Sequence, residues 1–138
     1  MSVVIDTKVF VSACLGSGPA NKVLSACLMG TCQPLMGSAL FLEYEDVLGR
    51  SGLWAKSPLT AGDRADLLDI FLASCRWTRV YFAWRPNLPD DADNHLIELA
   101  VAGGASVIVT RNLRDLTRRE LQFPGLRTLD PAAFLKET

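Results

Sequence analysis

The sequence has little of what several familiar classes of protein require. It holds one histidine, His95, and its four cysteines show no CxxC spacing, so a zinc site of cysteine and histidine is poorly supported. It contains no GxSxG elbow, no GxxxxGK[ST] loop and no GxGxxG after a strand, which argues against a serine hydrolase and a glycine-rich phosphate loop. The formal net charge is -1, so contact with a nucleic acid would need a local basic patch.

Long apolar runs are also missing. The longest apolar stretches, such as residues 105–109, are far shorter than the ~20 residues that a membrane helix needs. The chain starts on an apolar run with no basic segment and no small-residue cleavage site, so we expect no signal peptide. The cysteines are expected to be small packed residues in a reducing compartment, and Cys27 and Cys32 could pair only if the fold brought them together. We therefore expect a cytoplasmic protein without membrane contact.

What is present suits one α/β domain over residues 1–138. Hydrophobic residues make up 49% of the chain, which is enough for a single core. Runs typical of strands alternate with runs typical of helices, which predicts right-handed βαβ units and a mainly parallel sheet between layers of helices. We expect Ser38 and Thr60 to cap helices. The expected strands are 3–5, 33–36, 79–82, 106–109 and 127–129, and the expected helices are 20–29, 39–48, 61–73, 91–102, 116–121 and one that starts at Pro131.

Acidic and polar residues gather where the strands end. In open α/β sheets, sites lie beyond the carboxyl ends of the strands, so these segments could converge. Asp6 directly follows a buried strand and needs a partner to offset its desolvation. The other candidates are Glu43, with Glu45 and Asp46 beside it in a helix, Asp90, Asp91 and Asp93 at the start of the fourth helix, and Thr110, Asn112 and Asp115 after the strand 106–109.

Plain structural roles compete with these readings. Asp90 fits a helix N-cap and Asp93 the third helical position, an arrangement that suits the positive end of a helix without any ligand. His95 is expected on a helix surface, paired with Asp91 four positions earlier. The arginines near the C-terminus could equally be a phosphate-binding patch or a solvated helix face; they are Arg111, Arg114, Arg118 and Arg119.

Clustered carboxylates are therefore the clearest chemical signal. Oxygen-rich sites suit Mg²⁺ or Mn²⁺. Two such ions can support phosphodiester hydrolysis without a histidine.

The chain resembles the PIN-domain family, which includes the ribonuclease toxins of prokaryotic toxin–antitoxin pairs. Within this family it is most similar to a VapC-like single-domain branch. The likeness covers essentially the whole chain, with four motifs in the right order. It is carried by residues 4–13, 42–48, 90–100 and 107–116, and also by 123–125 and 129–135.

The resemblance implies a three-layer α/β/α fold and a metal-dependent endoribonuclease that acts on RNA. Asp6, Glu43 and Asp93 match the family's acidic ligands, and Asp90 matches an acid just before the third motif. An antitoxin partner is implied, and PIN domains often dimerise, for which the apolar surface of the third helix is a candidate. Among the remaining residues, Asn112 or Asp115 would orient a ligand or water, Thr7, Ser38 and Thr110 would hydrogen-bond to the site, and Arg111 and Arg114 would contact RNA phosphates.

Two residues depart from the family pattern. Lys8 stands where asparagine is usual, and Asn112 stands at the fourth acidic position. Both changes reduce the negative charge of the site. They leave open a second reading, a PIN fold with a weakened or inactive metal site that binds RNA or a protein without cutting. A third reading, a phosphoryl-transfer domain of receiver or haloacid-hydrolase type, is poorly matched because the neighbouring acids that those folds use are missing.

Overall fold

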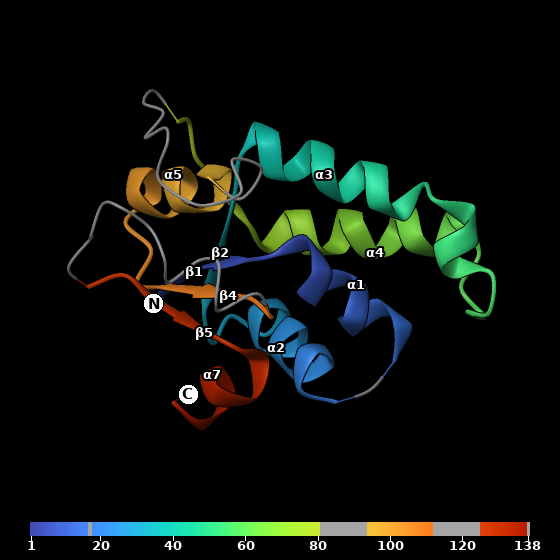
Figure 1. Cartoon of the computed structure of the whole chain (residues 1–138), viewed down its shortest axis with the longest axis horizontal. Coiled ribbons are helices and arrows are strands. Elements are labelled where there is room, and N and C mark those ends of the chain that lie inside the picture. The colour runs from blue at the N-terminus through green and yellow to red at the C-terminus, as the bar shows by residue number, and fades with distance from the viewer. Residues whose placement is uncertain (17, 81–93, 112–124, 138) are drawn as a thin grey trace.

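A five-stranded parallel sheet forms the centre of the molecule, with strand order β3-β2-β1-β4-β5 (Figure 1). The structure is a computed structural model, and it describes residues 1–16, 18–80, 94–111 and 125–137. The predicted α/β/α architecture is confirmed. The strands are β1 (Ser2–Ile5), β2 (Gln33–Met36), β3 (Arg76–Trp77), β4 (Val107–Val109) and β5 (Arg127–Leu129). The helices are α1 (Thr7–Leu15), α2 (Pro19–Leu28), α3 (Ser38–Leu48), the 3-10 turn η1 (Ser51–Trp54), α4 (Ala61–Ser74), α5 (Asn94–Gly103) and α7 (Pro131–Lys136).

The neighbouring strands β1 and β4 carry continuous apolar runs, as expected for strands covered by helices on both faces. Val3 to Ile5 of β1 pair in register with Val107 to Val109 of β4, and all these side chains are buried. Helix α5 packs against β1, β2 and β4 on one side of the sheet, while α2 and α7 lie together on the other (Figure 1). This register brings the ends of β1 and β4 to the same sheet edge.

Three aromatic rings join the helices α1, α3 and α4. Tyr44 stacks on Phe10 with 4.7 Å between ring centroids and lies 5.9 Å from Phe71. All three rings are buried. The Tyr44 hydroxyl donates a 2.7 Å hydrogen bond to the carbonyl of Ile5, the last residue of β1. The cluster therefore fixes α3 against the end of the strand that precedes Asp6.

Several local predictions hold and others are wrong. Thr60 forms a reciprocal capping box with Asp63 at the start of α4, as expected. Ser38 is the first residue of α3 rather than its cap, since Gly37 occupies the cap position. The strand expected at 79–82 lies instead at Arg76–Trp77, because the backbone of these two residues pairs with β2 at the sheet edge. Residues 81 and 82, the expected helix 116–121 and the expected start of the fourth helix at 91–93 lie outside the described residues.

Cys27 and Cys32 are brought together, with their sulfur atoms 3.5 Å apart, and both remain free thiols. Both side chains are buried, while Cys14 and Cys75 are half-buried, in line with the packed roles expected for them. In the described part of the chain, no helix has the length and apolar character needed to cross a bilayer.

Candidate functional site

Asp6 is held at the junction of β1 and α1. Its backbone N–H donates to the carbonyl of Val109 on β4, at 3.0 Å, and its carbonyl accepts from the N–H groups of Val9 and Phe10 in the first turn of α1. The residue occupies the N-cap position, yet its carboxylate does not cap the helix. Instead Oδ2 accepts a 2.7 Å hydrogen bond from the hydroxyl of Thr110, which directly follows β4.

The environment of Asp6 disfavours its negative charge. Only 6% of the residue is exposed, and burial raises the pKa of the carboxyl above its usual value. The Thr110 hydrogen bond opposes this rise, while the nearby negative charge of Glu43 adds to it. A buried carboxylate kept beside a second carboxylate is costly for folding, which is a common sign of a functional position.

Glu43 approaches from α3 and is bound by a residue of α5. His95 Nε2 lies 2.9 Å from Glu43 Oε2, and this hydrogen bond is the main reason that the pKa of Glu43 is lowered. Burial opposes the lowering, because the Glu43 side chain is only 39% exposed. Nδ1 of His95 is buried and makes no hydrogen bond to the residues that the structure describes. His95 therefore connects α5 to α3 at the site, and the expectation that it lies on a helix surface is wrong: its side chain is only 13% exposed.

The first turn of α1 supplies two further groups. Lys8 is exposed and forms no ion pair within the described residues, but its positive charge lowers the pKa of both Asp6 and Glu43. Thr7 is buried, and its hydroxyl makes no hydrogen bond of ordinary geometry in the described structure, but as a donor close to Glu43 it also lowers the pKa of that carboxyl. Lys8 thus acts on both carboxylates.

The other candidates divide into those that the structure describes and those that it does not. Thr110 is fully buried against Asp6, Arg111 after it is exposed, and Ser38 lies in the first turn of α3. Glu45 and Asp46 are exposed on α3, and Asp46 pairs with Arg50. The predicted roles of Asp90, Asp91, Asp93, Asn112, Arg114 and Asp115 fall on residues outside the described ranges.

Comparison with known families identifies the chain. A family model described as PIN domain matches residues 2–114, which is most of the chain. The chain belongs to the PIN-domain family. Members of this family are generally nucleases that use divalent metal ions. The comparison with curated proteins found no match.

The fold of this PIN domain is also found in a solved complex. One chain in the crystal structure of VapBC2 from Rickettsia felis bound to a DNA fragment from their promoter superposes with a TM-score of 0.64. The sequences are 17% identical, and the match covers 94% of this PIN domain and 98% of that chain. At this identity the likeness supports the shared fold.

Two carboxylates among the described residues have the chemistry of divalent-metal ligands. Asp6 and Glu43 provide oxygen ligands of the kind that Mg²⁺ and Mn²⁺ prefer, and a cation would offset both the burial of Asp6 and its repulsion from Glu43. Residues 1–16, 18–80, 94–111 and 125–137 contain no group of three or more histidine, cysteine, aspartate or glutamate residues placed to hold a metal. The carboxylates of Asp6 and Glu43 suit Mg²⁺ or Mn²⁺, and a complete coordination shell would need further ligands.

Sequence reasoning missed His95 as a member of the site. Its partner Glu43 is 52 positions away, so neither neighbouring residues nor helical spacing indicates the contact. One available signal was that the apolar residues Leu96, Ile97 and Leu99 follow it on α5, which predicts that this part of the helix is buried. Glu98 was also passed over and is 7% exposed on the same helix.

Proposed function

We propose that this PIN domain is a metal-dependent endoribonuclease that acts as the toxin of a toxin–antitoxin pair. The observation that carries the proposal is the meeting of Asp6 and Glu43 at the carboxyl end of β1 in a chain that matches the PIN-domain family over residues 2–114. A parallel sheet places functional groups at this edge. The donor chemistry suits an ion that assists phosphodiester hydrolysis.

Asp6, Glu43 and Asp93 would hold the metal, with Asp90 as the alternative acid from the third motif. Asn112 or Asp115 would orient a ligand or a water molecule. When bound, Mg²⁺ or Mn²⁺ supplies a more acidic water and charge stabilisation for the leaving oxygen.

The protein's own residues prepare these ligands. Thr110 donates to Oδ2 of Asp6, which fixes the carboxylate and leaves Oδ1 for another contact. His95 does the same for Glu43 by binding Oε2. Such supporting contacts around a metal ligand typically change metal affinity or activity by about 10- to 100-fold when removed. Arg111, exposed beyond the end of β4, and Arg114 would position the RNA backbone through its phosphates.

Two protein partners belong to the proposal. The structural relative from Rickettsia felis is part of a VapBC2 complex, so we infer a cognate antitoxin for this chain. We also infer a homodimer. The suggested interface of the dimer is α4. Leu68 and Phe71 of this helix are buried in the core, so Ile70 is its most exposed large apolar residue, at 52%.

The proposal is tested by incubating structured and single-stranded RNAs with Mg²⁺, Mn²⁺ or EDTA. The wild type is compared with Asp6→Asn and Glu43→Gln, and with Asp69→Asn as a control for an exposed aspartate on α4. We expect cleavage by the wild type and by Asp69→Asn, no cleavage in EDTA, and a loss of at least about 100-fold in the two site variants. Equal cleavage by all four proteins would reveal a contaminating nuclease and contradict the assignment.

A second candidate function is a PIN fold that binds RNA or a protein without cutting. The contacts that favour it are the His95 hydrogen bond, which occupies Oε2 of Glu43, and the nearby charge of Lys8. Both compete with a cation for the carboxylates. This candidate predicts that the wild type binds RNA in the same assay, while no metal produces cleavage and no Mn²⁺ binding is measurable.

A further inference from the structure

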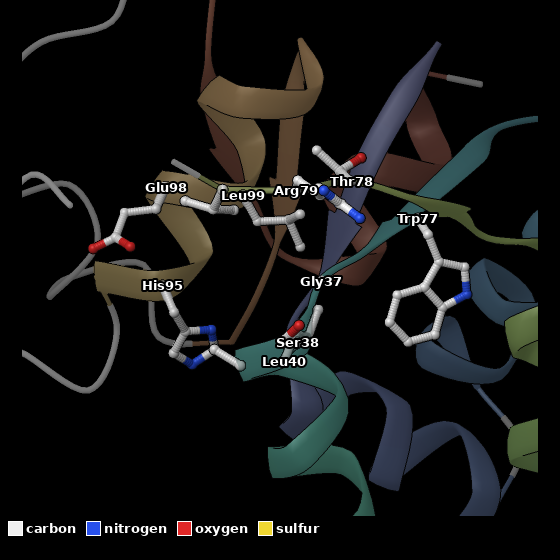
Figure 2. Close-up of a pocket in the computed structure, with 11 residues that line it drawn as sticks. Gly37, Ser38, Leu40, Trp77, Thr78, Arg79, His95, Glu98 and Leu99 are labelled. Carbon is white, nitrogen blue, oxygen red and sulfur yellow. The ribbon is translucent and has the colours of Figure 1, made fainter. Parts of the chain in front are cut away.

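A pocket of about 760 Å³ opens beside the candidate metal ligands. It lies beyond the ends of β2 and β3 and between the first turns of α3 and α5. Figure 2 shows the Trp77 ring on one side of the pocket and the His95 and Glu98 side chains on the opposite side. Since His95 also binds Glu43, the pocket and the carboxylates share a wall. A molecule long enough to contact both the carboxylates and the pocket would pass His95.

The exposed ring of Trp77 is the first feature that suggests a ligand. Trp77 ends the edge strand β3 and is 54% exposed, although tryptophan is highly buried on average. Its ring meets Phe41 edge to face, with 5.5 Å between centroids, which restricts its orientation. The indole N–H donates no hydrogen bond to the described residues. A fixed ring with an open surface can stack on a flat partner at a low cost in side-chain entropy.

Arg79 supplies the second feature. It lines the same pocket, is exposed and has no ion-pair partner among the described residues. The backbone between Arg79 and Trp77 is anchored, because the N–H of Thr78 donates to the carbonyl of Met36 at 2.9 Å. An aromatic ring and a cation on one anchored segment are the combination with which proteins bind single-stranded nucleic acids.

We propose that this pocket binds one nucleotide of single-stranded RNA, with the base stacked on Trp77 and a phosphate bound by Arg79. The inference rests on the proposed function and adds to it two residues, Trp77 and Arg79, that hold a nucleotide of the substrate beside the carboxylates. A base within a duplex must first be unpaired and unstacked to enter a pocket, whereas a base in single-stranded RNA enters without that cost. The volume lies within the range of about 300–1,000 Å³ usual for sites of small ligands. The pocket thereby favours single-stranded over duplex RNA next to the bond that is cut.

The test is a binding measurement in EDTA, where a metal-dependent nuclease does not cut. Fluorescence anisotropy with a labelled single-stranded RNA compares the wild type with Trp77→Ala, Trp77→Phe, Arg79→Ala and Arg79→Lys. Met29→Ala and Arg50→Ala are the controls, because they remove an exposed apolar residue and an exposed arginine outside the pocket. Thermal melting confirms that each variant folds.

We expect Trp77→Ala to weaken binding at least about fivefold, the lower end for one base–aromatic stack, and Trp77→Phe to retain most of the affinity. A series of RNAs carries one abasic site each, at successive positions. Loss of the base at one of these positions should weaken binding to the wild type by a similar factor and should not change binding to Trp77→Ala. Arg79→Ala should reduce the salt dependence by about one phosphate contact, and Arg79→Lys should retain it. The two controls should bind as the wild type does.

Different failures are distinguishable. If the wild type binds and cleaves RNA but Trp77→Ala binds equally well at every abasic position, the nucleotide pocket is wrong and the nuclease proposal stands. If the wild type neither binds nor cleaves any RNA, both proposals are wrong. If Trp77→Ala binds RNA normally but loses a co-expressed protein partner, the pocket is a protein interface and the nucleotide assignment is overturned.

Discussion

Tyr44 connects the core of the protein to the candidate site, and replacing it with phenylalanine isolates one hydrogen bond. The ring is fully buried and stacks on Phe10, so Tyr44→Phe keeps the packing and removes only the hydroxyl. That hydroxyl donates at 2.7 Å to the carbonyl of Ile5, the residue before Asp6. The carbonyl would lose this donor inside the core. Leaving a buried polar group without its partner costs about 1–3 kcal/mol.

We therefore expect Tyr44→Phe to lower the free energy of unfolding by about 1–2 kcal/mol, which for a domain of this size lowers Tm by roughly 3–6 °C. Urea unfolding followed by circular dichroism measures the change. Tyr44→Ala, which also removes the ring, should cost about 3–5 kcal/mol and serves as the comparison. A change below about 0.5 kcal/mol in Tyr44→Phe, or equal losses in both variants, would refute the reasoning.

Three further predictions concern the carboxylates. The pKa of Asp6 is raised in the folded protein, so the stabilising contribution of this residue is full below its usual pKa of 3.8 and is lost as pH rises through the folded pKa. In thermal melts, Asp6→Asn should therefore unfold about 3 °C above the wild type at pH 7 and lose that advantage near pH 3.5. A lower Tm for Asp6→Asn at pH 7 would contradict this prediction. Lys8→Asn removes a positive charge that acts on Asp6 and Glu43, so we expect Mg²⁺ to bind about two- to fivefold more tightly by calorimetry, and unchanged affinity would sink the idea. His95→Ala removes the donor to Glu43 and should weaken Mn²⁺ binding about tenfold. His95→Gln keeps an N–H donor and should weaken Mn²⁺ binding less. Equal Mn²⁺ affinities in the two variants would show that the hydrogen bond to Glu43 does not support metal binding.

The strands with strong local signals were predictable from the sequence. A continuous β-branched run placed β4 within one residue, β2 lies at the expected residues 33–36, and the alternation with helices predicted the parallel sheet. Helix α1 was not predicted, because Val9 and Val11 are β-branched residues in an apolar run that continues from β1 and no side chain caps the helix. Its helical conformation instead follows from packing against α2 and α3.

Strand β3 and His95 were misplaced for a different reason. The position of β3 depends on backbone pairing of Arg76 and Trp77 with β2, and both side chains are exposed, so no apolar pattern marks the strand. The role of His95 depends on Glu43, which reaches it only after α3 and α5 have packed together. The ligand candidate Asp6 was accessible to sequence reasoning because a charged residue after a buried strand needs a local explanation.

The most direct test of the central claim is titration of the protein with Mn²⁺ by isothermal calorimetry. We expect that the wild type binds Mn²⁺, that Asp6→Asn and Glu43→Gln each weaken binding at least about tenfold, and that the surface variant Asp69→Asn does not. Equal Mn²⁺ affinity in the wild type, Asp6→Asn and Glu43→Gln would contradict the claim that these two carboxylates form the metal site.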